Sequence, residues 1–128
     1  MAALNEITSS FRHVRLLLAR EKDHPEGASR EGIDLLIPLD SNGRLDFRQW
    51  KSHQELCRVR YFNQHGTVKV GLLKYRPVDQ WYIDFKEGEQ DDEVGFRLGA
   101  ESFTIGEYVA INAPGKNHTY RVARVEKP

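Results

Sequence analysis

The chain has 128 residues, of which 39% are apolar and 30% are charged, and these values are typical of one globular domain with its own core. Nineteen Lys and Arg balance nineteen Asp and Glu, which argues against nucleic-acid binding through overall charge but leaves a local basic patch open. A single cysteine, Cys57, excludes an intramolecular disulfide. Because we find neither a secretory signal nor an apolar stretch of about 20 residues, we expect a cytoplasmic protein with no membrane partner.

The first third of the chain predicts two strands. Small polar residues at 1–10 predict a flexible N-terminus, followed by a single domain at 11–128. Alternating apolar residues predict a strand over Phe11–Arg20, with a short helix as the alternative. The charged stretch 21–32 contains Pro and Gly and predicts a surface loop, and Ile33–Pro38 predicts a short strand that ends at its proline.

A turn, the only predicted helix and a strand follow. The segment Asp40–Gly43 ends in Asn-Gly and predicts a tight turn with positive φ at the glycine. Asp46 resembles a helix N-cap with a glutamine three residues later, so we expect a short helix over Phe47–Gln54. Clean alternation over Leu56–Phe62 predicts a strand that buries Cys57 on its inner side.

The next apolar residues predict two more strands. Val68, Val70 and Leu72 recur at every second position, and we expect all three to face inward. A second strand is predicted around Trp81–Phe85, whereas residues 94–100 show no clear period and predict irregular structure.

The chain closes with a predicted β-hairpin. Its two strands are expected at Phe103–Ile111 and Thr119–Val125, on either side of a turn-rich gap. Val125 is out of phase with Val122, and a bulge near Ala123 would return it to the inner face.

Six or seven short strands, spaced by short connections, predict an all-β fold with antiparallel pairing. A single antiparallel barrel with one short helix is favoured because closure removes exposed sheet edges.

Several short strings occur in an order that resembles a group of small uncharacterised bacterial all-β proteins, over residues 14–125. The resemblance implies a bacterial cytoplasmic origin and transfers no activity, ligand or catalytic residue. The strings are Pro25-Glu26-Gly27, Pro38-Leu39-Asp40 with Gly43 and Asp46, Cys57-Arg58-Val59-Arg60, Asp91-Asp92-Glu93 with Gly95-Phe96-Arg97-Leu98, and Gly106-Glu107-Tyr108-Val109.

The densest charge cluster is acidic and includes Asp91, Asp92 and Glu93. Hard cations such as calcium bind several carboxylate oxygens, but adjacent residues of an extended chain point to opposite sides. We therefore expect these three residues to serve recognition or surface charge pairing. A carboxylate-dependent enzyme around Asp92 and Glu93 is an alternative.

Other candidate chemistry has a simpler structural interpretation. Asp40–Asp46 resembles the start of a calcium loop, but Lys51 stands where the twelfth-position carboxylate is required. The five histidines lack the spacing of a metal site, and Cys57 is expected to be a buried structural residue. Glycine-rich phosphate loops and nucleophile elbows are absent from the sequence, so we predict no catalytic residue, metal or cofactor.

Arg58 and Arg60 share the outward face of their predicted strand with Phe62. Basic residues beside an aromatic ring on a sheet are typical of single-strand nucleic-acid binding, and they are also common on solvated faces. Arg121 and Arg124 would extend this patch if their strand were its neighbour. The sequence favours a non-enzymatic binding module for an unknown protein or small-molecule partner, with a nucleic-acid-binding barrel as the main alternative.

Overall fold

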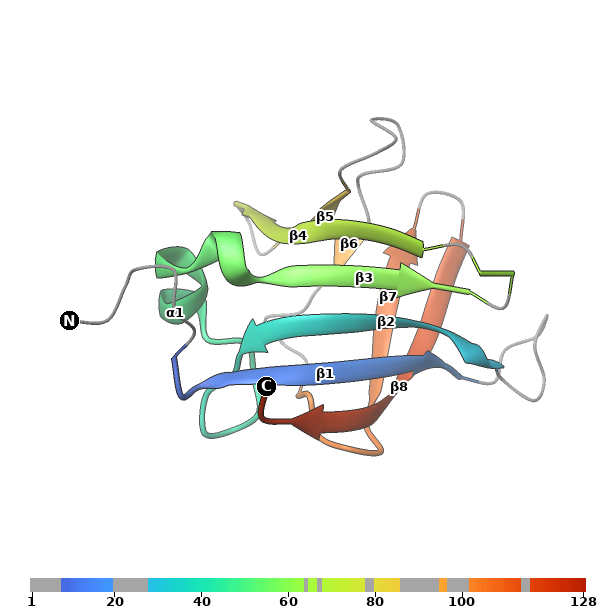
Figure 1. Ribbon diagram of the computed structural model, residues 1–128, viewed down its shortest axis with the longest axis horizontal. Coiled ribbons are helices and arrows are strands. Elements are labelled where there is room, and N and C mark those ends of the chain that lie inside the picture. Colours follow the sequence, from blue (N-terminus) through green and yellow to red (C-terminus); the bar gives the residue numbers. More distant parts are fainter. Residues whose placement is uncertain are drawn as a thin grey trace.

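The computed structural model describes residues 8–19, 28–63, 65–66, 68–77, 80–85, 95–96, 102–113 and 116–128. Within this part of the chain, consecutive strands pair antiparallel, and the last strand pairs back with the first, so the sheet closes into a barrel (Figure 1). The elements are β1 (Phe11–Leu18), β2 (Ala28–Pro38), α1 (Phe47–Ser52), a 3-10 turn (Gln54–Leu56), β3 (Arg58–Phe62), β4 (Val68–Arg76), β5 (Gln80–Phe85), β6 (Gly95–Phe96), β7 (Tyr108–Ala113) and β8 (Lys116–Glu126).

The all-β antiparallel barrel predicted from the sequence is confirmed. The stretch predicted to be irregular contains the two-residue β6, which pairs with β5 and β7 and brings the described strands to eight. Among the described residues, no helix has the length and apolar character needed to cross a membrane.

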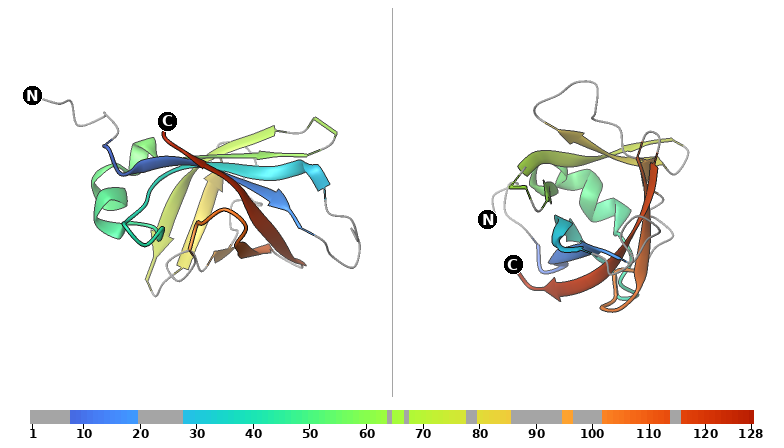
Figure 2. Two further views of the ribbon diagram at one scale, coloured as in Figure 1. Left: turned by 90° about the horizontal axis from the view of Figure 1, so that it is seen from below. Right: turned by 90° about the vertical axis from the view of Figure 1, so that its right-hand side faces the viewer.

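The helix α1 lies across one end of the barrel (Figure 2). It begins after Asp46, whose side chain accepts a hydrogen bond from the backbone N–H of Gln49 at 3.2 Å, as the predicted N-cap requires. Trp50 points back into the barrel, where its Nε1 donates to the carbonyl oxygen of Leu73 at 2.9 Å. The helix therefore closes this end through one buried aromatic side chain.

The inner faces of the strands form one apolar core. Buried side chains come from β1, β2, β3, β5, β7 and β8; those of β1, β3, β5, β7 and β8 lie on the predicted inner faces, whereas no inner face was predicted for β2. They are Val14, Leu16, Leu18, Ile33, Leu35, Ile37, Val59, Trp81, Ile83, Phe85, Val109, Ile111, Tyr120 and Val122.

The predicted inner face of β4 was wrong. Val68 and Val70 are 47% and 41% exposed, whereas Leu73 is fully buried. The inner position between them belongs to Gly71, where a Cβ atom would overlap the carbonyl oxygen of Asp84 on β5. Because only glycine permits this close approach of the two strands, the apolar pattern of the valines does not mark the core side.

The predicted loop at 21–32 was also too long, because β2 begins at Ala28. Ala28 pairs with Leu18 and Gly32 pairs with Leu17, with a register shift between the two pairs. The charged residues Arg30 and Glu31 therefore belong to a strand, in the irregular stretch between its last two pairs with β1, where no apolar pattern marks it.

The bulge predicted in the last strand is confirmed. Arg15 pairs with Arg124 and the next residue, Leu16, pairs with Val122, so Ala123 is the extra residue of β8. As a result Val122 is buried in the core, and Val125 packs against it despite the odd spacing.

Candidate functional site

Two rows of residues cross the outer face of the barrel from β8 to β4. In the first row, the strand register pairs Arg124 with Arg15, Arg15 with Asp34, Asp34 with Arg60, and Arg60 with Val70. Directly paired residues of an antiparallel sheet project to the same side, so these five side chains form one line across five strands.

The second row lies one step along the strands. Its register pairs Arg121 with Leu17, Leu17 with Gly32, Gly32 with Phe62, and Phe62 with Val68. The two rows together place arginines on β8, β1 and β3, and valines on β4. We call this surface, with Arg58 included, the arginine face.

Asp34 is the charged centre of the first row. Its side chain is only 11% exposed, and it accepts two hydrogen bonds from Arg15, Nε to Oδ1 at 2.8 Å and Nη2 to Oδ2 at 3.0 Å. Arg60 donates from Nη1 to Oδ2 at 3.3 Å. The hydrogen bonds that Arg15 donates to Asp34 raise the pKa of the Arg15 guanidinium, against the opposing effect of burial. One carboxylate thus fixes two guanidiniums on different strands.

Phe62 supports the same two guanidiniums. The Cζ atoms of Arg15 and Arg60 lie 5.3 Å and 5.4 Å from the centroid of its ring, within the range of cation–π attraction. The ring lies over Gly32, where a Cβ atom would stand 3.0 Å from its Cζ. Phe62 is therefore engaged by its neighbours, and its contribution is to hold the arginines above the sheet.

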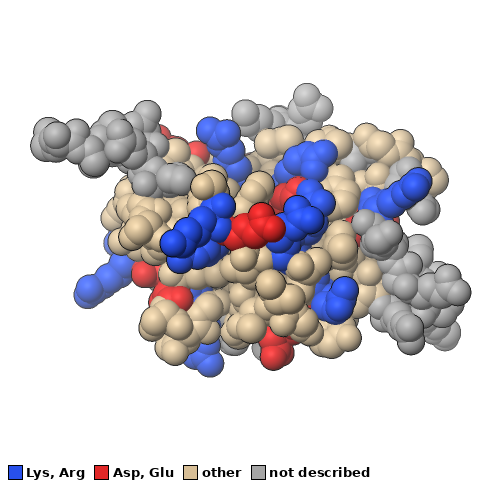
Figure 3. Space-filling model, turned by 60° about the horizontal axis from the view of Figure 1, so that its bottom comes forward, with Lys and Arg blue, Asp and Glu red and all other residues tan. Residues whose placement is uncertain are grey.

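The arginine face carries more cations than anions. Arg58 is exposed on the same side of β3 as Arg60, and Arg124 forms a 3.3 Å ion pair with Glu126 on β8. Among the described residues of this face, five arginines stand near two carboxylates, Asp34 and Glu126, and a third carboxylate, Asp84 on β5, lies beyond Leu72 in the row of Arg58. Figure 3 views the β1 and β8 side of the barrel and shows Lys and Arg side chains spread across it with acidic side chains between them.

The structure brings together half of the residues that the sequence singled out. Arg58, Arg60 and Phe62 share the outer face of β3, as their alternation predicted. Asp91, Asp92 and Glu93 lie outside the described residues.

The arginines of the last strand join the face in a way that was not predicted. β8 pairs with β1 and β7 and not with β3, so the condition under which Arg121 and Arg124 would extend the patch directly is not met. Arg15 on β1 makes the link between them, and both Arg15 and Asp34 were missed. The available signal was Asp34 itself, a single acid in an apolar strand, because such a residue needs a charged partner.

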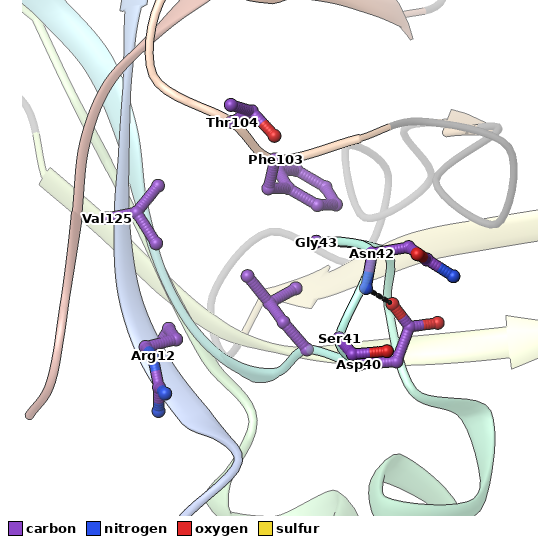
Figure 4. Close-up of a pocket in the computed structure, with 9 residues that line it drawn as sticks. Arg12, Asp40, Ser41, Asn42, Gly43, Phe103, Thr104 and Val125 are labelled. Atoms are coloured by element: carbon purple, nitrogen blue, oxygen red, sulfur yellow. Dashed lines mark hydrogen bonds between the residues drawn. The ribbon is translucent and has the colours of Figure 1, made fainter.

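A pocket of about 350 Å³ opens near the end of the barrel that α1 covers (Figure 4). The turn at 40–43, the segment Phe103–Thr104, Val125 and Arg12 line it. The Asp40 side chain accepts hydrogen bonds from the backbone N–H groups of Asn42 and Arg44 at 2.8 and 3.0 Å. These bonds account for the shape of the turn without the calcium ion that its sequence resembles a site for. Arg12 donates to two backbone carbonyls, so the pocket offers little convergent polar chemistry.

An aromatic cluster fills the barrel beneath α1. The rings of Phe47, Trp50, Tyr75 and Trp81 have centroid separations from 4.9 to 6.2 Å. Nε1 of Trp81 is buried and has no hydrogen-bond partner among the described residues. Four of the six ring pairs are edge to face and two are tilted, so the rings pack as aromatic neighbours usually do. Trp50 and Trp81 belong to the core, Tyr75 packs against it, and Phe47 covers the cluster from the solvent side.

Cys57 is buried, as predicted. Burial raises the pKa of its thiol to about 12, against a smaller lowering by Lys74. The thiol therefore remains protonated at neutral pH and is a poor nucleophile. In the part of the chain that the structure describes, no three His, Cys, Asp or Glu side chains gather in a geometry that could hold a metal ion.

Comparison with known proteins adds no relative, because no family model, curated protein or solved structure matches the chain. The resemblance to small bacterial proteins stays a prediction. Function must therefore be inferred from the described side chains. Among them, the arginine face is a set of guanidiniums held in place by a carboxylate and an aromatic ring.

Proposed function

We propose that the protein is a non-enzymatic binding module that binds an anionic partner on the arginine face. The observation that carries this proposal is the first row, where Arg124, Arg15 and Arg60 lie on one side of the sheet around a single buried carboxylate. Arg15 and Arg60 are 38% and 48% exposed, so their guanidiniums remain accessible to a partner.

The surroundings of the arginines favour binding over simple solvation. Asp34 and Phe62 hold Arg15 and Arg60 from below, through hydrogen bonds and cation–π contacts. Side chains that are already ordered lose less conformational entropy when a partner binds. An arginine that only interacts with water does not need a carboxylate and an aromatic ring to hold it in place. The contacts of Arg15 and Arg60 with Asp34 and Phe62 are therefore consistent with the binding of a partner.

The enzyme alternative has less support. Asp92 and Glu93, on which it depends, lie outside the described residues, and Cys57 is buried and protonated. Bacterial origin and a cytoplasmic location remain part of the proposal, on the basis of the sequence alone.

Retention on immobilised heparin, a dense polyanion, tests the proposal. We expect the wild-type protein to elute at a higher salt concentration than the Arg60→Ala and Arg124→Ala variants, because each variant loses one guanidinium from the face. Arg48→Ala is the matched control, since Arg48 is an exposed arginine on α1, outside both rows. Wild-type protein in the flow-through, or an equal loss in Arg48→Ala, would overturn the proposal.

A further inference from the structure

We infer that the anionic partner is a single-stranded nucleic acid, an inference that rests on the proposed function. The first reason is the type of cation in the two rows. Every cationic side chain in the two rows is an arginine, and no lysine belongs to either row. The four are Arg15, Arg60, Arg121 and Arg124. A guanidinium presents a planar set of donors that matches two phosphate oxygens at once, which an ammonium group cannot do.

The donors of these guanidiniums are only partly used. Arg15 binds Asp34 through Nε and Nη2, and Arg60 binds it through Nη1. Nη1 of Arg15, and Nε and Nη2 of Arg60, make no hydrogen bond that the structure records among the described residues. These groups belong to side chains that are about half exposed, so an oxyanion can bridge the two arginines from the solvent side.

The second reason is the apolar strip beside the arginines. Val68 and Val70 are 47% and 41% exposed, and they stand directly opposite Phe62 and Arg60 in the two rows. Exposed apolar side chains next to guanidiniums offer one surface for bases and another for phosphates. Bases also stack on the planes of guanidinium groups, so the engagement of Phe62 does not prevent stacking.

This combination distinguishes single strands from other anions. A duplex presents its phosphates but keeps its bases stacked inside, so the valines would contribute nothing to its binding. An acidic polypeptide supplies carboxylates to the arginines, but it has no planar base beside each charge that could contact the valines or stack on a guanidinium. Zero net charge of the whole chain is compatible with this inference, because the excess of cations is local to the arginine face.

Fluorescence anisotropy with a labelled twelve-nucleotide oligothymidylate tests the inference. Three to five phosphate contacts predict a slope of about −2 to −3.5 for the logarithm of the association constant against the logarithm of the salt concentration. The affinity should therefore fall about 16- to 130-fold between about 50 and 200 mM salt. Arg60→Ala and Arg124→Ala should each reduce the slope by about 0.7, and Arg48→Ala should leave it unchanged.

A second pair of variants tests the apolar strip. Val70→Ser should weaken oligothymidylate binding at least about threefold, because it removes apolar contact area, while retention on heparin stays unchanged. The exposed Ile105, in the turn before β7, provides the matched control Ile105→Ser, which should change neither property.

The outcomes separate this inference from the proposed function. Equal affinity for the oligothymidylate, a duplex of the same length and poly-L-glutamate would overturn the inference and leave the anion-binding module standing. Failure to bind heparin and every one of these probes would overturn both. Tighter binding of the single strand, together with the loss in Val70→Ser, would support both.

Discussion

Replacing Asp34 with asparagine removes the negative charge at the centre of the arginine face and keeps the shape of the side chain. The wild-type carboxylate accepts three hydrogen bonds, at 2.8, 3.0 and 3.3 Å, from two guanidiniums. Hydrogen bonds to charged groups contribute about 1.5–3 kcal/mol when they are buried. Exposed ion pairs contribute only about 0–1 kcal/mol. Because Asp34 is buried and both arginines are about half exposed, we expect Asp34→Asn to lower the free energy of unfolding by about 1–2 kcal/mol.

Urea unfolding at low and high salt measures this effect. The loss in Asp34→Asn should shrink at about 1 M salt, where the Debye length is about 3 Å. Arg60→Ala, which removes only the longest of the three bonds, should cost less than Asp34→Asn. An unfolding free energy within about 0.3 kcal/mol of the wild-type value would refute the reasoning, because it would mean that solvent replaces the Asp34 contacts without loss.

Three further predictions concern the barrel itself. For Cys57, burial raises the pKa from 9.0 to about 12, so the stabilisation should be complete below about pH 9 and be lost as the pH rises toward 12. At pH 10 the wild type should have lost about 1.4 kcal/mol more of its unfolding free energy than Cys57→Ala, and an equal pH dependence of urea unfolding in the two proteins would contradict this. Val109→Ala should cost about 1–3 kcal/mol because the side chain is fully buried, and an unchanged melting temperature would place the residue on the wrong face. Gly32→Ala should destabilise by more than about 2 kcal/mol, since its Cβ would overlap the Leu16 carbonyl oxygen; circular dichroism melting checks this, and wild-type stability would contradict it.

The fold was largely predictable because local patterns decide most of it. Alternation located the inner faces of β1, β3 and β5, and the break in the alternation of β8 predicted the bulge at Ala123. The phase of β4 was not predictable, because it depends on how closely Gly71 approaches β5. Alternation identifies two faces of a strand, but a contact with another strand decides which of them is inside.

The candidate site was less predictable than the fold. Arg58, Arg60 and Phe62 lie two residues apart on one strand, so their common face follows from the geometry of a strand. Asp34 and Arg15 reach them only through the register of three strands. Register between distant segments depends on backbone pairing and turn geometry, which the residue types of each strand do not specify alone.

The bulge at Ala123 makes the charge of the outer surface depend on one local irregularity of β8. Arg121 and Arg124 are three positions apart, yet the extra residue allows both to lie on the outside of β8. If Ala123 were deleted, the strand would return to regular alternation, and Arg124 and Val122 would keep their sides. If the bulge were straightened with every residue kept, the residues beyond it would change sides, and either Arg124 would turn toward the barrel interior or Val122 would turn toward solvent. A variant of β8 that loses the bulge but not a residue would therefore lose a binding charge and disturb the core in the same step.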